Sequence, residues 1–162
     1  MLSISVHHPQ VMDFIKIKRD LKKVTGANIS VRVSDEFMEA VKLGQRYEQR
    51  WPVDSADPEI SSKDVYAQEV WNALIESAHA SAEPGVLFWD TAKRNTPSDI
   101  YEAQGFGSVS TNPCGEIILS PYDSCRLMLM NLTSFVKDPW KENASFNWGD
   151  FRNKTRKAQR LM

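Results

Sequence analysis

A short motif around residue 114 brings together three side chains that could act on one small molecule. Asn112, Cys114 and Glu116 alternate with Pro113 and Gly115. Proline fixes its own φ and glycine allows a positive φ, so we expect a tight turn and not a regular helix or a long strand. A thiol, an amide and a carboxylate at one bend would suit covalent or radical chemistry at the sulfur. A structural turn with a buried thiol is the alternative interpretation.

The chain has only one further cysteine, Cys125, which lies 11 positions after Cys114. This spacing matches no C-x-x-C motif, and the chain has only three histidines, so no metal site is expected. The first residues contain no basic leader followed by an apolar segment. Without such a leader, two cysteines favour a reducing, cytoplasmic location in which the thiols are free or catalytic.

Length and composition indicate a globular protein of one domain. The chain has 162 residues, a net charge of −1, five tryptophans and seven phenylalanines. The aromatic content favours a packed core, and the near-zero charge gives no field that would attract nucleic acid. No apolar run approaches the roughly 20 residues of a membrane span. We therefore expect neither DNA contact nor membrane insertion.

The hydrophobic pattern at the start of the chain predicts a β-α-β unit with parallel strands. Apolar residues alternate with Ser30 and Arg32 in the second strand, so that one face is apolar and the other polar. The elements of this unit are a strand over 2–6, a helix over 9–20 and a strand over 28–33.

The rest of the chain is predicted to continue as an α/β fold. Gly105 and Gly107 could cradle a phosphate, but the surrounding dinucleotide-binding pattern is missing, and we interpret them as part of a flexible loop. The expected elements are a helix over 34–44, a loop over 45–60, a capping box at Ser61 and Asp64, a helix over 62–82, a strand over 86–89 buried on both faces, a loop over 90–109, buried strand-like segments over 117–119 and 126–132, and an amphipathic helix over 151–162.

Several segments, in the same order along the chain, resemble the large catalytic subunit of ribonucleotide reductase. The similarity is greatest to the adenosylcobalamin-dependent class and runs through nearly the whole chain. The segments that carry it are His8-Pro9, Phe14–Leu21, Val24–Arg32, Asp35–Met38, Asn112–Glu116 and Pro121–Leu132.

The resemblance implies part of a ten-stranded α/β barrel, built from two half-barrels, with a finger loop that carries the thiol. Residues 1–162 would be a single segment of this catalytic barrel domain, incomplete at both ends. The effector-binding loops, the later strands and the partner of Cys125 would lie outside the segment. We therefore expect the isolated chain to have no reductase activity.

The resemblance also implies a role for each residue of the motif. Cys114 would become a thiyl radical that removes the 3′ hydrogen of the ribose, and Glu116 would act as the base on the 3′ hydroxyl. Asn112 would hydrogen-bond the ribose hydroxyls, and Cys125 would be one half of the redox-active dithiol. The substrate-binding segment would consist of Asn112, Pro113, Cys114, Gly115 and Glu116.

The implied cofactor is adenosylcobalamin, although the sequence offers no residue that could be assigned to bind it. The implied partners are a ribonucleoside di- or triphosphate, the remaining segments of the same reductase and a thioredoxin-like reductant. The product would be a deoxyribonucleotide for DNA synthesis.

Two other functions fit the same residues. The chain could be a non-catalytic, reductase-like module for binding or assembly. It could also be an unrelated thiol enzyme in which a histidine activates Cys114. His79 is the histidine considered for this role, since its helical spacing predicts a contact with the core, where a lone histidine is more often structural.

Overall fold

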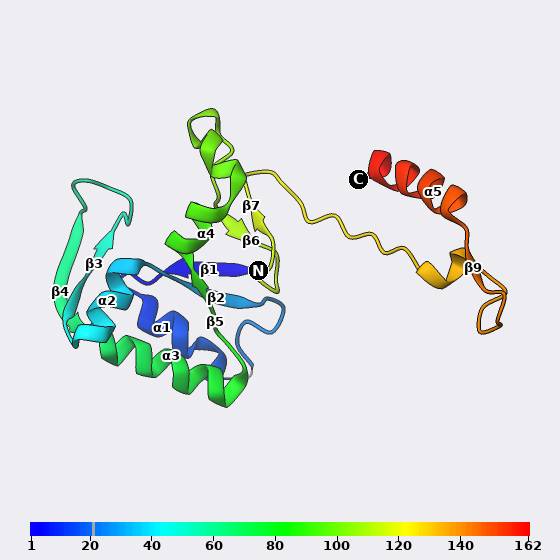
Figure 1. Cartoon of the computed structure of the whole chain (residues 1–162). Helices are drawn as coiled ribbons and strands as arrows, with labels where there is room; N and C mark the ends of the chain where they lie inside the picture. Colours follow the sequence, from blue (N-terminus) through cyan, green and yellow to red (C-terminus); the bar gives the residue numbers. More distant parts are fainter. Residues whose placement is uncertain (21) are drawn as a thin grey trace. The chain divides into compact units, whose positions relative to one another are not determined.

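The computed structural model describes residues 1–20 and 22–162. Leu21, which ends one of the segments that carry the family resemblance, lies outside the described residues. The chain forms two compact units, Met1–Asp123 and Ser124–Met162, and each is described separately. Figure 1 labels the elements of both units.

A three-stranded parallel sheet is the centre of the first unit. Its strand order is β1-β2-β5, so the strand with alternating apolar and polar residues lies in the middle. The predicted β-α-β unit with parallel strands is confirmed. The elements are β1 (Leu2–Ser5), α1 (Val11–Lys16) with the 3-10 turn η1 (Ile17–Arg19), β2 (Ile29–Val33) and β5 (Gly85–Phe88).

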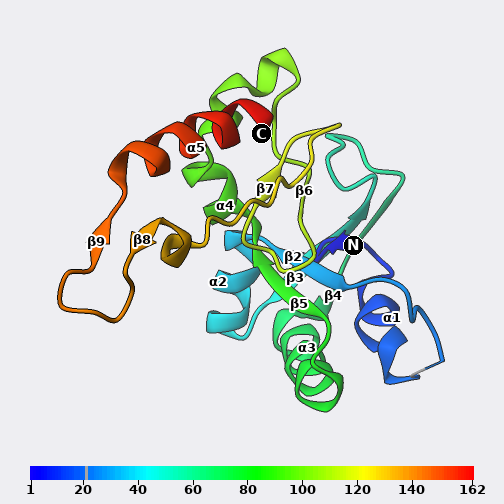
Figure 2. The same cartoon turned by 90° about the vertical axis from the view of Figure 1, so that its right-hand side faces the viewer.

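Three helices cover one face of this sheet, and the views in Figures 1 and 2 agree on this arrangement. Val31 and Val33 of β2 are fully buried against the helices, together with Phe37. The start of α2 was predicted correctly, because the Ser34 hydroxyl accepts a hydrogen bond from the Phe37 amide at 3.1 Å. Gly44, at φ 66°, ends the helix. The helices are α1, α2 (Asp35–Leu43) and α3 (Ala67–Ser81).

Residues 46–66 form a hairpin, so the predicted loop over 45–60 and the capping box at Ser61 and Asp64 are wrong. The strands are β3 (Arg46–Trp51) and β4 (Ile60–Tyr66), and α3 begins only after them. The inward positions of β3 carry Tyr47 and Gln49. The Gln49 side-chain amide donates to the Tyr47 hydroxyl at 2.8 Å, and the Tyr47 hydroxyl donates to the Val6 carbonyl at 2.9 Å. Because the buried face is partly polar, the strand lacked an apolar alternation.

The segment 90–109 was predicted as a loop, and this is also wrong. It contains α4 (Trp89–Asn95) and η2 (Pro97–Gln104), which ends at Gly105 with φ 89°. The left-handed conformation at the end of this helical turn therefore explains why residue 105 is glycine. Strand β5 is not buried on both faces, since Phe88 is 51% exposed and β2 is its only partner within the described residues.

The second unit is small and has little buried surface. Phe135 is its one buried hydrophobic residue among those described, and its ring contacts that of Phe151 at 5.3 Å between centroids. The predicted helix over 151–162 is confirmed and begins earlier than expected. The elements are η3 (Leu132–Phe135), β8 (Val136–Lys137), β9 (Ser145–Phe146) and α5 (Trp148–Leu161).

The prediction of a buried strand over 126–132 is wrong. No strand is assigned to 126–131, and Leu127 and Leu129 are 84% and 99% exposed. No neighbouring strand pairs with this segment in the part of the chain that the structure describes. An apolar sequence without a pairing partner cannot satisfy its backbone groups as a strand.

Candidate active site

The cysteine motif forms the turn of a short antiparallel hairpin made of β6 (Ser110–Thr111) and β7 (Ile118–Leu119). Asn112 closes the turn twice, because its backbone amide donates to the Ile117 carbonyl at 3.2 Å and its Oδ1 accepts from the Ile117 amide at 3.0 Å. The Gly115 amide donates to the Asn112 carbonyl at 3.0 Å. The predicted tight turn is thus confirmed. A strand lies within the segment predicted over 117–119, but its residues are half-buried and not buried as predicted.

The turn lies against strand β5. Gly115 has φ 82°, and a Cβ atom at this position would lie 3.2 Å from Leu87 Cδ2. Both the backbone conformation and the close approach therefore favour glycine here. Figures 1 and 2 show the hairpin on the side of the sheet opposite the helices.

Cys114 is exposed and lines a cavity of about 160 Å³ between the turn and the sheet. Strands β2 and β5 provide the opposite wall of this cavity. The main lining residues are Ser30, Gly85 and Leu87 from the strands, and Pro113, Cys114 and Gly115 from the turn.

The other predicted site residues lie elsewhere. Asn112 is buried and Glu116 is exposed, and neither lines the cavity beside Cys114. Cys125 is half-buried and belongs to the second unit. Their catalytic roles therefore stay predictions. His79 is exposed, so its predicted contact with the core is wrong.

Two side chains fix the base of the cysteine hairpin. Asp99 accepts hydrogen bonds from the Ser108 amide at 2.8 Å and from the Ser108 hydroxyl at 2.6 Å. Partial desolvation raises the pKa of Asp99, but these two hydrogen bonds and the charge of Lys93 outweigh it, so the pKa lies below its usual value. On the strand side, Arg32 donates to the Val109 carbonyl at 3.4 Å.

Arg32 is a half-buried cation on the polar face of the sheet. Its guanidinium carbon lies 5.1 Å from the centroid of the Trp89 ring. Burial lowers the pKa of Arg32, and the charge of Asp54 opposes this effect. The Arg32 Nε is buried without a hydrogen-bond partner among the described residues. Such a group is costly and is typical of functional surfaces.

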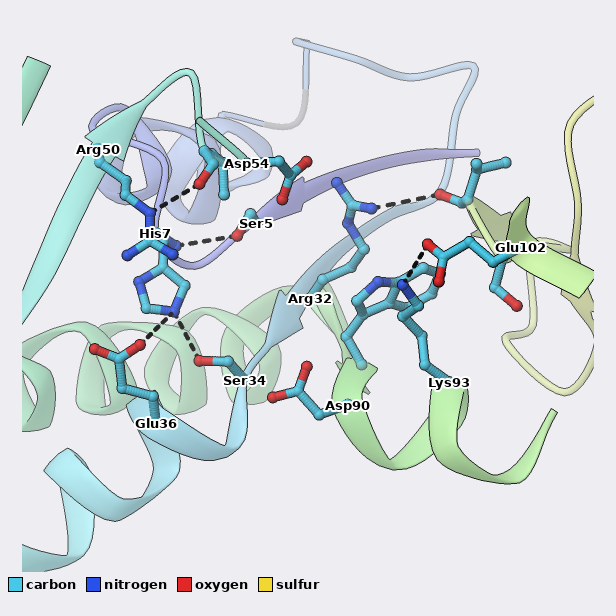
Figure 3. Close-up of a pocket in the computed structure, with 14 residues that line it drawn as sticks. Ser5, His7, Arg32, Ser34, Glu36, Arg50, Asp54, Asp90, Lys93 and Glu102 are labelled. Atoms are coloured by element: carbon cyan, nitrogen blue, oxygen red, sulfur yellow. Dashed lines mark hydrogen bonds and ion pairs between the residues drawn. The ribbon is translucent and has the colours of Figure 1, made fainter. Parts of the chain in front are cut away.

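A larger cavity of about 670 Å³ lies beyond the carboxyl ends of the three parallel strands (Figure 3). Two of its cations are in ion pairs, Lys93 with Glu102 at 2.9 Å and Arg50 with Glu48 at 3.2 Å. The His7 ring lies between the Glu48 carbonyl and the Ser34 hydroxyl, each at 2.7 Å. Sequence reasoning missed this cavity because its residues come from distant segments. The only local signal was the polar alternation in the strands.

Within residues 1–20 and 22–162, no group of three or more histidine, cysteine or acidic side chains could hold a metal ion. Over the same residues, no helix has both the length and the apolar character that a membrane crossing requires.

The fold and the site define an α/β domain in which an exposed thiol is held over a parallel sheet. The family model described as "Ribonucleotide reductase, barrel domain" matches residues 1–162. The chain therefore belongs to the ribonucleotide reductase barrel-domain family and is a fragment of the catalytic subunit of such an enzyme. The described residues form no closed barrel.

Similar proteins bear names that agree with the family. A "Vitamin B12-dependent ribonucleoside-diphosphate reductase" from Thermoplasma acidophilum is 36% identical over 139 residues, which are 83% of this chain and 17% of that protein. A protein of the same name from Mycobacterium tuberculosis is 34% identical over 140 residues, 85% of this chain and 19% of that protein. The "Vitamin B12-dependent ribonucleotide reductase" of Streptomyces coelicolor is 30% identical over an alignment of 171 positions, gaps included, which covers 91% of this chain and 17% of that protein. The chain thus spans less than a fifth of the length of these relatives.

Proposed function

We propose that this chain supplies the radical-bearing thiol of an enzyme that reduces ribonucleotides to deoxyribonucleotides. The observation that carries the proposal is the position of Cys114, exposed at the tip of a tight turn and facing a small cavity over the sheet. A sulfur radical can exchange a hydrogen atom with a ribose C–H bond. The turn holds the sulfur in one place because two hydrogen bonds, from the backbone amide and to the side chain of Asn112, join the start of the turn to Ile117 at its end.

The proposed reaction uses Cys114 as a reversible hydrogen-atom acceptor. The thiyl radical of Cys114 takes the hydrogen atom from C3′, which forms an S–H bond and leaves the unpaired electron on the sugar. Glu116 takes the proton of the 3′ hydroxyl, and the 2′ hydroxyl leaves as water. Two electrons and two protons come from a dithiol that includes Cys125 and closes to a disulfide. Cys114 then returns its hydrogen atom to C3′, and Glu116 returns its proton to the 3′ oxygen.

Asn112 has two proposed tasks in this reaction. Its Oδ1 accepts from the Ile117 amide and shapes the turn. Its Nδ2 hydrogens are the groups that would donate to the ribose hydroxyls. The exposed Glu116 would come into contact with substrate once the remaining segments of the barrel enclose the turn. Enclosure would also exclude water, and a dry site strengthens the hydrogen bond between Glu116 and the sugar.

The proposed cofactor is adenosylcobalamin, which supplies the radical when it is bound. The thiol of Cys114 is exposed, as an external source of the radical requires. No described residue is assigned to hold the cofactor. The proposed substrate is a ribonucleoside di- or triphosphate, since the names of the relatives include both. The disulfide would be reduced by a thioredoxin-like protein.

We further propose that residues 1–162 are one segment of the barrel domain, that the cysteine hairpin is its finger loop and that the chain is inactive without the other segments. The chain spans less than a fifth of its relatives, and within the described residues its parallel sheet has β1 and β5 as edge strands and does not close. Multiple turnover by the pure 162-residue chain would contradict this proposal.

The test is Cys114→Ser in the complete reductase that contains this chain. We expect the rate of deoxyribonucleotide formation to fall by at least about 1,000-fold, which is about 4 kcal/mol on the barrier, because a serine hydroxyl cannot replace the sulfur radical. Cys125→Ser is the matched control. It should still allow a single turnover when a small dithiol is present. Undiminished turnover by Cys114→Ser would exclude the proposed function.

A second candidate is a reductase-like module that binds nucleotides without acting on them. One observation favours it, since neither Asn112 nor Glu116 lines the cavity beside Cys114. This function predicts nucleotide binding by the complete protein and no deoxyribonucleotide product, with or without Cys114.

A further inference from the structure

We propose that the hydroxyl group of Ser30 contacts a ribose hydroxyl of the substrate in the cavity beside Cys114. This inference rests on the proposed function and adds a substrate-binding residue to it. Ser30 lies on β2, the central strand of the sheet, and lines the same cavity as Cys114.

The Ser30 hydroxyl faces the cavity without a partner among the described residues. The residue is only 6% exposed, and its hydroxyl makes no hydrogen bond to any of the residues that the structure describes. Among the described residues, the Arg32 Nε is the one fully buried side-chain polar atom without a partner, so the Ser30 Oγ is accessible from the cavity. A hydroxyl that faces a cavity without a protein partner is therefore available to a ligand.

Gly85 keeps space for this hydroxyl. Gly85 is the register partner of Ser30 on β5, and a Cβ atom at Gly85 would lie 2.8 Å from the Ser30 Oγ. The φ angle of Gly85 lies outside the left-handed region, so backbone conformation does not require glycine here. Space for the Ser30 hydroxyl gives a reason for glycine at this place.

The size of the cavity suits the edge of a sugar. Its volume of about 160 Å³ is about five times the ~30 Å³ that one water occupies in the liquid. It is smaller than the roughly 300 Å³ at which pockets for whole drug-sized ligands begin. A sugar edge fits this space, and the base and phosphates would lie outside. A sugar edge is also the part of a nucleotide that must meet Cys114.

The sheet offers a matched control. Ser3 on β1 is the register partner of Ser30 on the other side, but it lines a different cavity and not the one beside Cys114. Ser3→Ala and Ser30→Ala thus remove the same group from adjacent strands, and only the second removes it from the cysteine cavity.

The experiment measures the dissociation constants of a ribonucleotide and of its 2′-deoxy and 3′-deoxy counterparts, using the complete reductase. We expect Ser30→Ala to weaken ribonucleotide binding by about 2- to 13-fold, the value of one neutral hydrogen bond. Its effect should fall below twofold for the counterpart that lacks the contacted hydroxyl. Ser3→Ala should change all three constants by less than twofold. Gly85→Ala, which displaces the Ser30 hydroxyl, should also weaken the binding of the ribonucleotide more than that of the counterpart that lacks the contacted hydroxyl.

Two results would overturn the inference. Equal losses for all three nucleotides would mean that Ser30 only shapes the cavity, and unchanged binding of the ribonucleotide would mean that it makes no contact. Neither result affects the proposed function, which depends on the turnover of Cys114→Ser. If Cys114→Ser is inactive and Ser30→Ala shows no discrimination, the inference about Ser30 alone is wrong.

Discussion

The two faces of the β1-β2-β5 sheet differ in chemistry and, we infer, in purpose. On one face, Ile4, Val31 and Val86 pack against the helices and contribute to the core. On the other, Ser30 and Arg32 lie beneath the cysteine hairpin and beside the two cavities described above. Parallel sheets are usually apolar on both faces, because helices cover both. The comparison teaches that a single strand can stabilise the fold with every second residue and leave the alternate residues free for a ligand.

The polar face has a cost in stability. The Arg32 Nε is buried without a described partner, so the folded chain bears the desolvation cost of this group. Sites that bind a ligand commonly contain such local exceptions to good packing. The comparison therefore predicts that substitutions on the helix face change stability and that substitutions on the hairpin face change activity.

The largest expected effect on stability is at Phe37, which is fully buried on the helix face and stacks edge-on against Tyr47 at 4.9 Å. Phe37→Ala should lower the free energy of unfolding by about 3–5 kcal/mol because it leaves a cavity in the core. Urea unfolding of the chain, followed by circular dichroism, measures this loss. Leu87→Ala, at the half-buried wall of the cysteine cavity, should cost less than half as much. Equal losses would remove the distinction between the two faces.

A smaller effect, on activity, is expected at Gly115. Gly115→Ala should lower the turnover of the complete reductase by about 10-fold, since a left-handed alanine costs roughly 1–2 kcal/mol and its Cβ presses on Leu87. The control is Gly105→Ala, which has a similar φ of 89° and no atom within 4 Å of the added Cβ. If both variants lose activity alike, backbone strain explains the loss and contact with the sheet does not.

The smallest expected effect concerns pH at the base of the hairpin. The pKa of Asp99 is lower in the folded chain than its usual value, so its hydrogen bonds to Ser108 stabilise the hairpin above that usual value. This contribution is lost as the pH falls through the folded pKa. Hydrogen exchange of the Ser108 amide should accelerate in acid relative to the Val109 amide, which donates to Leu119 within the hairpin. Asp99→Asn should abolish this difference in pH dependence. If the difference persists in Asp99→Asn, another group is responsible.

Two predictions from the sequence were wrong because the structure of these segments depends on residues that are distant along the chain. The hairpin β3-β4 was missed because Tyr47 and Gln49 bury polar groups that are satisfied by each other and by Val6. The segment 126–132 has the composition of a buried strand and is exposed, because a strand also needs a partner.

The sequence by itself determined the local features of this protein. Alternating residues in β2 fixed which face is polar, Ser34 and Gly44 fixed the ends of α2, and the glycine and proline around Cys114 fixed a tight turn. Only the tertiary structure decided that Cys114 faces Ser30 and Gly85 across a cavity, and that Asn112 and Glu116 lie outside it. The physical reason is that periodicity and backbone constraints act between near neighbours. The pairing of strands and the docking of a hairpin depend on contacts between distant residues, which no local pattern specifies.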